Sequence, residues 1–184
     1  MRHVPKQWKT TRIITLRKLG KADYTRLKAF YPISLLPTIS KGLEAVVAAR
    51  LLYITEKYNL LLMNHFGARP RRLAKQALNV LVKRIYQAWR GSKILTLISF
   101  DVKGAFNRVH LKVLERQLAA RRVPKPMVEW IGDFYTGQHA SVTVGRYASE
   151  VAEIEYVGIP QGSLLSLLLY VFYNADLVER LIDS

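Results

Sequence analysis

An aspartate stands between an apolar run and a glycine near the middle of the chain, in Ser99-Phe100-Asp101-Val102-Lys103-Gly104-Ala105-Phe106. Positions 94–100 form a largely apolar run that contains β-branched and aromatic residues, which predicts a buried strand that ends at Asp101. A carboxylate there can hold Mg²⁺ with help from a backbone carbonyl, and a glycine lets a triphosphate approach the main chain closely. A helix N-cap or a solvated turn is the plainer interpretation of a single aspartate.

A second motif, Gly158-Ile159-Pro160-Gln161-Gly162-Ser163, follows some fifty residues later. Its glycines allow the chain to pass close to a ligand, and Ser163 can cap the free amides of a helix that starts there. An ordinary turn explains Pro160-Gln161-Gly162 equally well when the motif stands alone.

Four short boxes together resemble the reverse transcriptases of non-LTR (LINE-like) retrotransposons. Residues 99–109 match D-V-K-G-A-F-x-x-V, and residues 158–163 match G-I-P-Q-G-S. Residues 31–44, YPISLLPTISKGLE, look like the R-P-I-S-L-L box, and residues 65–70, HFGARP, look like the F-G-x-R-P-G-R-S box. The boxes occur in the family's order, so the resemblance extends from about residue 12 to the end.

The resemblance implies roles for individual residues. Asp101 would ligate Mg²⁺, or Mn²⁺ in its place, with the Val102 carbonyl as a further ligand. The backbone amides of Lys103, Gly104 and Ala105 would face the triphosphate. Phe106 would select deoxyribose by crowding the 2′-hydroxyl, and Gln161 and Gly162 would line the nucleotide and template. Lys18 and Lys21 would neutralise the triphosphate, although ordinary surface lysines are equally expected there. The partners implied are an RNA template, a DNA primer and deoxynucleoside triphosphates.

The fold that the resemblance implies is α+β, a right-hand polymerase with fingers and a partial palm built on an antiparallel sheet. Residues 1–93 would form a basic, helical fingers region and residues 94–184 the partial palm, without a thumb. The family supplies further carboxylates in an Asp-Asp box downstream, and no two aspartates are adjacent in these 184 residues. Asp176 lies in a helical pattern and is no substitute. We therefore expect the isolated chain not to polymerise.

The net charge favours a polyanionic partner. Lys and Arg number 29 against 13 Asp and Glu, a formal charge of +16, and this excess predicts salt-sensitive binding to nucleic acid. The basic residues are spread as a groove that tracks phosphates would need: Lys6, Lys9, Arg12, Arg17, Lys18, Lys21, Arg26, Lys28, Arg69, Arg71, Arg72, Lys75, Lys83, Arg84 and Arg90. A basic RNA- or DNA-binding module without chemistry is the alternative function. Five aromatic residues lie among these charges and are more typical of a core than of base stacking: Tyr24, Phe30, Tyr31, Tyr86 and Trp89.

Hydrophobic periodicity predicts the remaining elements. A short strand is expected at 11–16, and prolines break residues 32–37. Helices are expected at 39–58, capped by Ser40, at 73–89, ended by Gly91, at 111–120, from about 127, and from Ser163. The apolar face of the helix at 39–58 is expected to contain Leu43, Val46, Val47, Arg50, Leu51 and Ile54. Alternation at 140–144 and 151–157 predicts a hairpin around a turn at 145–148.

Composition excludes several classes. The chain has no cysteine, so disulfides and thiolate metal sites are ruled out, and the four histidines lack zinc-ligand spacing. The first nine residues do not have the apolar core expected of a signal peptide, and the longest apolar stretch is shorter than a membrane span is expected to be. A soluble intracellular protein is expected, nuclear if the retrotransposon interpretation holds.

Several departures from the family boxes point in one direction. Tyr31 replaces arginine, Arg71 replaces glycine, and leucines stand at 73, 164 and 167 in place of serine, proline and proline. The changes at 71, 73, 164 and 167 can each follow from a single transition. A decayed retroelement copy is therefore a further hypothesis, and Arg71 would strain a position that needs a positive φ.

Overall fold

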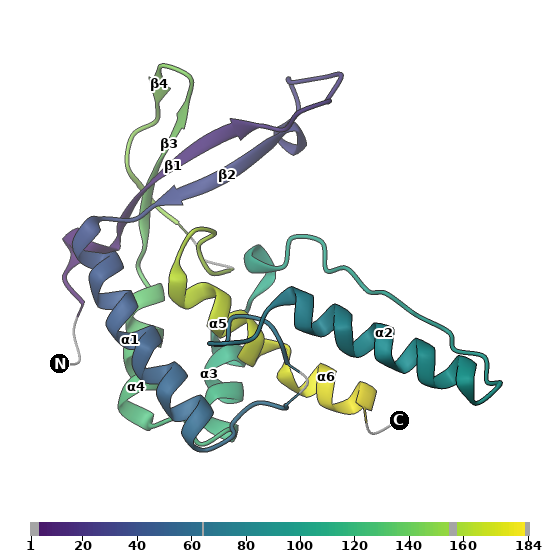
Figure 1. Ribbon diagram of the computed structural model, residues 1–184. Coiled ribbons are helices and arrows are strands. Elements are labelled where there is room, and N and C mark those ends of the chain that lie inside the picture. The colour runs from purple at the N-terminus through teal and green to yellow at the C-terminus, as the bar shows by residue number, and fades with distance from the viewer. Residues whose placement is uncertain (1–3, 64, 155–157, 183–184) are drawn as a thin grey trace.

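A sheet at one end and a layer of helices at the other make up the molecule in the computed structural model, which describes residues 4–63, 65–154 and 158–182 (Figure 1). The strands are β1 (Thr10–Arg17), β2 (Phe30–Leu35), β3 (His139–Val144), β4 (Tyr147–Ala148) and β5 (Ala152–Glu153). The helices are α1 (Thr38–Lys57), α2 (Ala74–Arg90), α3 (Leu111–Ala120), α4 (Lys125–Tyr135), α5 (Leu164–Tyr173) and α6 (Ala175–Ile182), with 3₁₀ turns η1 (Lys6–Lys9), η2 (Leu27–Ala29) and η3 (Phe106–Arg108).

The sheet has the order β2-β1-β3-β4, and β5 also pairs with β3. β1 runs antiparallel to β2 and parallel to β3, so strands far apart in the sequence are neighbours. The predicted strand at 11–16 is confirmed as β1. The prediction that prolines break residues 32–37 is wrong, because Pro32 lies within β2 opposite Thr15. β2 is an edge strand, where a residue without an N–H costs no ladder hydrogen bond.

The hairpin predicted beyond residue 140 is confirmed in part. The chain turns after β3 at Gly145, which has a φ of +61°, and returns as β4. Both residues of β4 lie within positions 145–148, where the turn is expected. β5 then pairs with the start of β3. Residues 155–157 of the predicted second strand lie outside the described residues.

The core lies between α1, α3, α4 and α5, where α1 packs on α5 and α3 packs on both α4 and α5. Its largest fully buried side chains are Tyr135, Phe134, Phe172, Leu51, Leu114, Leu118 and Ile131. The predicted helices at 111–120, from about 127 and from Ser163 are confirmed as α3, α4 and α5, with α4 beginning two residues earlier than expected. Pro126 sits in the first turn of α4, where the missing N–H has no helical partner to lose.

The predicted helix at 39–58 is confirmed as α1, but its start and its buried face differ. Pro37 precedes the first turn, and Ser40 donates from Oγ to the Trp8 carbonyl (2.7 Å) instead of capping. The buried positions are Ser40, Glu44, Ala48, Leu51 and Thr55. Val46 and Arg50, which the apolar pattern placed inside, are exposed, because α5 packs against the stripe that contains Glu44.

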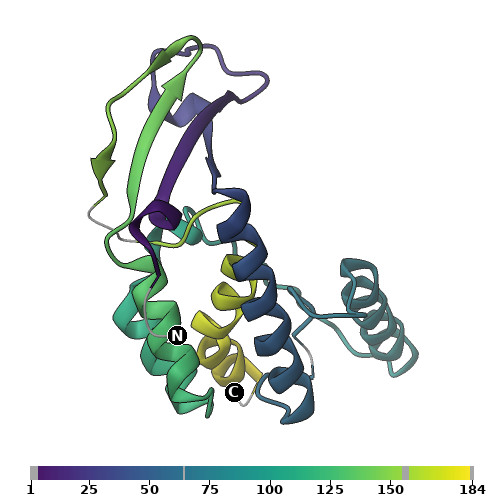
Figure 2. The same cartoon turned by 90° about the vertical axis from the view of Figure 1, so that its left-hand side faces the viewer.

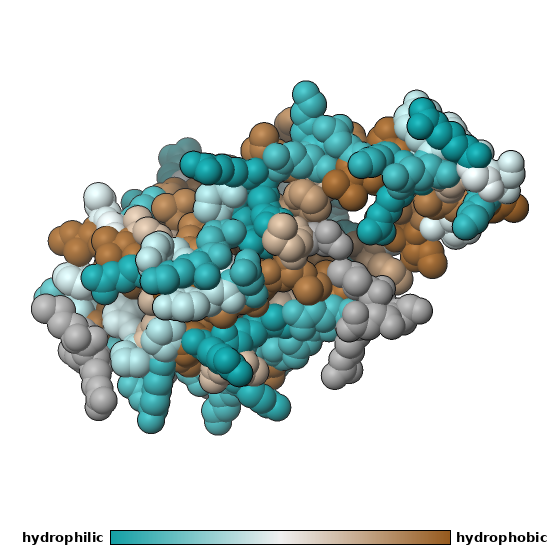
Figure 3. All heavy atoms as spheres, turned by 60° about the horizontal axis from the view of Figure 1, so that its bottom comes forward, coloured by the Kyte–Doolittle hydropathy of each residue, from teal (hydrophilic) through white to brown (hydrophobic). Residues whose placement is uncertain are grey.

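α2 forms an arm that stands apart from the helical layer (Figures 1 and 2). It has the predicted bounds to within a residue and ends at Gly91, but none of its residues is buried. Residues 93–102 follow it without regular structure, and no residue from 91 to 104 is buried. Apolar side chains therefore lie open between polar ones along this arm, at the right of Figure 3.

The prediction of a buried strand at 94–100 is wrong for the described molecule. Ile94 is 97% and Phe100 76% exposed, and neither belongs to a strand. A strand requires a neighbour to pair its N–H and C=O groups, and the sheet of β1 to β5 lies at the other end. Local β-propensity alone did not supply that partner.

Candidate functional site

The motif at residues 99–109 and the motif at residues 158–163 contact each other in the structure. The N–H of Ile159 donates to the carbonyl of Phe106 (2.9 Å). A Cβ on Gly158 would lie 2.8 Å from both the Asn107 Cα and the Phe106 carbonyl oxygen, and the φ of Gly158 is +124°. Only glycine fits both the close approach and the backbone conformation. The residues after Asp101 and the start of the second motif therefore form one packed unit, called here the η3 contact.

The second motif also contacts the edge strand β2. The N–H of Ser34 donates to the carbonyl of Gln161 (3.2 Å). Gly162 has a φ of +112°, and a Cβ there would lie 3.2 Å from the Ser34 carbonyl oxygen. The segment Gly158–Gly162, called here the PQG turn, is thus held between η3 on one side and β2 on the other.

A buried carboxyl fixes the residue that follows the PQG turn. Ser163 caps α5 as predicted, because its Oγ accepts from the N–H of Ser166 (3.2 Å). The same hydroxyl donates to Oε2 of Glu44 in α1. Glu44 is 1% exposed, and its burial raises the pKa of the carboxyl above the ordinary value, against smaller opposing effects of Ser163 and Lys41.

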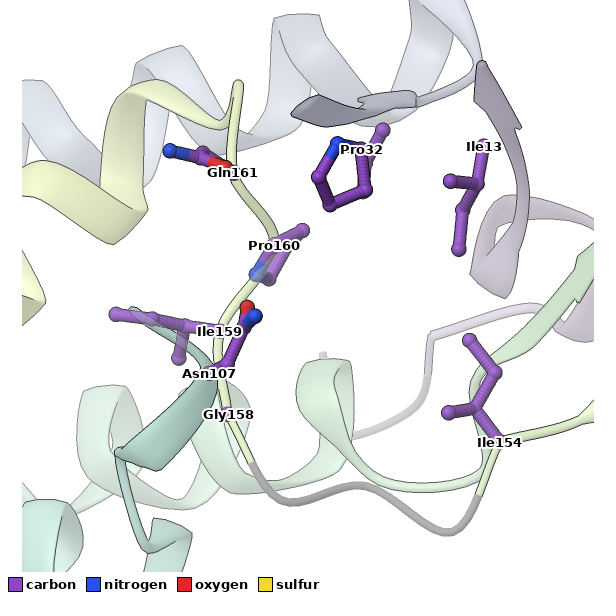
Figure 4. Close-up of a pocket in the computed structure, with 9 residues that line it drawn as sticks. Ile13, Pro32, Asn107, Ile154, Gly158, Ile159, Pro160 and Gln161 are labelled. Carbon is purple, nitrogen blue, oxygen red and sulfur yellow. The ribbon is translucent and has the colours of Figure 1, made fainter. Parts of the chain in front are cut away.

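A cavity of about 210 Å³ lies between the sheet and the PQG turn (Figure 4). Ile13 and Pro32 come from the sheet, and Pro160 and Asn107 lie opposite them. Ser34, Ile154, Gly158, Ile159 and Gln161 complete the lining. Its walls combine apolar side chains with the polar residues Ser34, Asn107 and Gln161, the mixed lining that is typical of sites for organic ligands.

Asp101 lies in the exposed segment before η3, and no hydrogen bond or ion pair within the described part of the chain engages its carboxylate. An unengaged carboxylate is the oxygen donor that Mg²⁺ prefers, and the Val102 carbonyl follows directly. No group of three or more metal-ligating side chains occurs among the described residues. These residues fit one part of a Mg²⁺ site, to which Asp101 would contribute one carboxylate.

The rest of the first motif changes from open to packed within five residues. Val102, Lys103 and Gly104 are exposed, with a φ of +67° at Gly104. Ala105 is half-buried, and the Phe106 ring packs on Tyr170 of α5 (ring centroids 5.2 Å apart). Gly104 is therefore accessible to solvent, whereas Phe106 is packed against the core.

Lys18 and Lys21 lie in and beside the loop that joins β1 to β2. Lys18 donates from Nζ to the Lys28 carbonyl (3.0 Å), and the same Nζ lies 4.6 Å from the centre of the Tyr31 ring. Lys21 is exposed. No contact among the described residues joins either lysine to the PQG turn or to Asp101, so the structure does not bring this part of the predicted site together with the rest.

The exposed aromatic residues contradict the expectation of a core role for three of the five. Tyr31, Tyr86 and Trp89 are 53%, 55% and 65% exposed. Tyr86 and Trp89 pack edge to face on the arm, while Tyr24 and Phe30 are half-buried and pack on one another. Exposed aromatic faces beside lysines and arginines can stack on bases.

The prediction that the basic residues are spread along a phosphate-binding groove is wrong for Arg69. It is 5% exposed, and its Nε and Nη2 donate to the two carboxylate oxygens of Glu56 (2.7 and 2.9 Å). Its Nη1 donates to the Leu62 carbonyl (2.7 Å). This fork fixes the loop after α1, and its burial keeps the guanidinium away from nucleic acid. Asp176, which the sequence excluded as a metal ligand, pairs with Arg121 (2.7 Å).

Sequence reasoning missed Glu44 and Ser34. Glu44 lies seven residues before Leu51, a spacing of two helical turns, and the buried stripe of α1 could have been traced back from that leucine. Ser34 acts through its main chain, for which the sequence carries no signal.

The departures from the family boxes have local consequences. Arg71 has a φ of +59°, so the strain expected for a non-glycine residue there is confirmed. Leu73, Leu164 and Leu167 are 62%, 63% and 51% exposed. Three leucines thus face solvent where the family boxes have serine and prolines.

Comparison with known proteins gives one consistent result. The family described as "Reverse transcriptase (RNA-dependent DNA polymerase)" matches residues 5–184. In Drosophila melanogaster, the chain is similar to the "Probable RNA-directed DNA polymerase from transposon X-element" (31% identity over 97% of this chain). It is similar there also to the "Probable RNA-directed DNA polymerase from transposon BS" (30% over 94%) and the "RNA-directed DNA polymerase from mobile element jockey" (29% over 95%). The chain spans 19% of the length of each of these relatives.

Proposed function

Because this chain belongs to the reverse transcriptase family, we propose that it forms the template- and nucleotide-binding part of an RNA-directed DNA polymerase active on a retrotransposon RNA. The observation that carries the proposal is the double contact of the PQG turn, with Phe106 on one side and Ser34 on the other. Three boxes that are far apart in the sequence meet around one cavity. Similarity to transposon polymerases over nearly the whole chain supports the same substrate class.

The proposed reaction joins the primer 3′-hydroxyl to the α-phosphorus of a deoxynucleoside triphosphate, and pyrophosphate leaves as the bridging P–O bond breaks. Paired Mg²⁺ ions stabilise the attacking and leaving oxygens in such transfers. In this chain, Asp101 and the Val102 carbonyl would hold the metal. The open backbone at Lys103, Gly104 and Ala105 would bind the triphosphate.

The remaining residues would position the template and the sugar. Gln161 and Gly162 would line the nascent base pair at the cavity, and Phe106, fixed against Tyr170, would crowd a 2′-hydroxyl. Lys18 and Lys21 would approach the triphosphate only after the β1–β2 loop moves toward the site, since they make no contact with it here. We assign residues 1–93 to fingers and 94–184 to part of a palm, although the sheet and the core draw on both segments.

We propose that a segment bearing the family's further carboxylates pairs with the exposed apolar run at 94–100. No strand of the described sheet pairs with the backbone N–H and C=O groups of this run. Unpaired backbone groups of this kind readily accept another strand. A hairpin bearing the family's Asp-Asp box would complete both the strand pairing and the metal site. The 184 residues alone would then bind substrates without extending a primer.

A binding experiment tests the proposal directly. A labelled RNA template annealed to a DNA primer is titrated with the 184-residue chain, with and without Mg²⁺ and the matching deoxynucleotide. Nucleotide and Mg²⁺ together should tighten binding about tenfold, and higher salt should weaken binding in every condition. Asp101→Asn should abolish the Mg²⁺-dependent gain only. Glu150→Gln, a change at an exposed carboxyl in the β4–β5 loop, is the control.

Two outcomes would contradict parts of the proposal. Affinity that ignores Mg²⁺, nucleotide and Asp101→Asn would identify a basic nucleic-acid-binding module without chemistry. Primer extension by the purified chain, abolished by Asp101→Ala, would show that no further carboxylates are needed.

The decayed-copy hypothesis rests on a separate observation, the positive φ at Arg71 together with the exposed Leu73, Leu164 and Leu167. The codons at these four positions test it. Codons that a single transition cannot reach from the family residue would remove its support.

A further inference from the structure

The box at residues 31–44 has a sequence match but no chemical role among those assigned above. It runs through β2 and into the first two turns of α1. Both of its ends contact the second motif: Ser34 donates to the Gln161 carbonyl, and Glu44 accepts from Ser163. The box therefore brackets the PQG turn from the strand side and from the helix side.

Glu44 makes the side-chain half of this bracket. The two partners are separated by 119 residues in the sequence, and both are buried. Ser163 uses its hydroxyl twice, as an acceptor from the Ser166 N–H and as a donor to Glu44. The rotation of that hydroxyl is consequently fixed, and with it the start of α5 directly after Gly162.

A carboxyl is a costly choice at this place in the core. Oε1 of Glu44 is buried and has no hydrogen-bond partner among the described residues, and a buried polar atom without a partner is unfavourable. The neighbouring buried positions of α1, Ala48 and Leu51, are apolar. Packing alone would be served better by leucine, so the hydrogen bond to Ser163 is the feature that explains the glutamate.

We propose that Glu44 is a positioning residue of the polymerase site, which through Ser163 fixes the PQG turn in the conformation that receives the template and the incoming nucleotide. The link to the nucleotide rests on the proposed function. In addition to the hydrogen bond from Ile159 to Phe106, two tethers hold the end of the turn: the Ser34 N–H on the Gln161 carbonyl, and Glu44 on Ser163, the residue directly after the turn. Loss of the Glu44 tether leaves the contacts with β2 and η3 in place and removes the contact with α1.

The test compares Glu44→Leu, Glu44→Gln, Ser163→Ala and the double variant Glu44→Leu/Ser163→Ala in the 184-residue chain. Glu150→Leu is the control for loss of a carboxyl elsewhere. Amide hydrogen exchange over residues 158–166 reports the turn itself. The nucleotide-dependent gain in primer–template affinity, with affinity without nucleotide measured alongside, reports its use.

Glu44→Leu and Ser163→Ala should each accelerate exchange over residues 158–166 by about tenfold. Both should reduce the nucleotide-dependent gain by a larger factor than they reduce affinity without nucleotide. The double variant should be no worse than Ser163→Ala, because Ser163→Ala already lacks the hydrogen bond to Glu44 and also lacks the cap on the Ser166 N–H. Glu44→Gln retains an acceptor and should restore both readouts.

Additive losses, or failure of Glu44→Gln to restore either readout, would overturn the proposal. So would faster exchange with an unchanged nucleotide response, which is the signature of a purely structural contact. If Glu44→Leu does not fold, Ser163→Ala and Glu44→Gln still decide the matter. A wild-type chain that shows no nucleotide response would instead refute the proposed function, and unchanged exchange in Ser163→Ala would refute the tether separately.

Discussion

The two halves of the candidate site are built in opposite ways. The PQG turn is tied to η3, to β2 and to α1, and Ser163 begins a helix whose inner face is buried. Asp101 and Val102 lie on an exposed segment with no strand beside it. The chain thus preforms the surface proposed for base and sugar, whereas the carboxylate proposed to bind Mg²⁺ lacks neighbouring carboxylates among the described residues.

The arm shows the same contrast on a larger scale. No residue of α2 is buried, while most of α5 is. A helix with an apolar face against solvent gains little from burial. The region around Asp101 and α2 is therefore expected to open at low free energy, and the turn only with the core.

The largest difference should appear when a ring is removed from each region. Phe172 is 0% and Phe100 76% exposed. Phe172→Ala should lower the free energy of unfolding by about 4 kcal/mol, and Phe100→Ala should change it by less than about 0.5 kcal/mol. Urea unfolding followed by circular dichroism measures both. Similar losses would show that residues 94–100 are buried in solution, as the sequence predicted.

Glycine substitutions sharpen the comparison within the site. Gly158→Ala places a methyl group against η3 at a positive φ and should cost about 3 kcal/mol. Gly104→Ala meets no atom closer than 4.0 Å, so only backbone strain of about 1 kcal/mol is expected. The same unfolding measurement applies. An equal cost at the two positions would mean that the η3 contact does not form.

The pH dependence of stability isolates Glu44. Because burial raises the pKa of its carboxyl in the folded state, the native protein binds more protons than the unfolded one, and stability falls as pH rises above about 4.5. Glu44→Gln removes this slope. The stability of wild type relative to Glu44→Gln should therefore decline from pH 4 toward neutrality, measured by urea unfolding at each pH.

Glu56 also contributes to the pH dependence of stability, with a sign opposite to that of Glu44. The hydrogen bond from Arg69 lowers the pKa of the Glu56 carboxyl. The contribution of Glu56 to the free energy of unfolding is therefore present when the pH is above the ordinary pKa of glutamate, and it is lost as pH falls. Both proteins carry Glu56, and its effect cancels in the difference. A difference that is flat with pH would show that Glu44 is solvated.

The smallest effect is expected at the proposed metal ligand. Asp101→Asn removes a charge that no described contact uses, so the free energy of unfolding should change by less than about 0.5 kcal/mol. Thermal unfolding without Mg²⁺ measures this. A loss well above that value would mean that Asp101 has a structural partner in solution.

Much of the secondary structure and one part of the site followed from local patterns. α3 begins and ends at the predicted residues, and Ser163 caps α5 because a serine before an apolar run satisfies free amides. The predicted buried face of α1 is wrong in part, because the periodicity of α1 admits two adjacent stripes and the packing of α5 selects the stripe with Glu44.

No described helix is both long and apolar enough to cross a membrane.

The sequence by itself determined the family, through four ordered boxes, and the local elements that short-range propensity specifies. Only the tertiary structure decided which of those boxes touch, that Arg69 is an internal ion-pair partner, and that Glu44 lies behind the PQG turn. It also left residues 94–100 outside the sheet. The physical reason is that caps and turns depend on neighbours in the chain, whereas strand pairing and buried hydrogen bonds depend on partners that only folding brings together, 119 residues apart for Glu44 and Ser163.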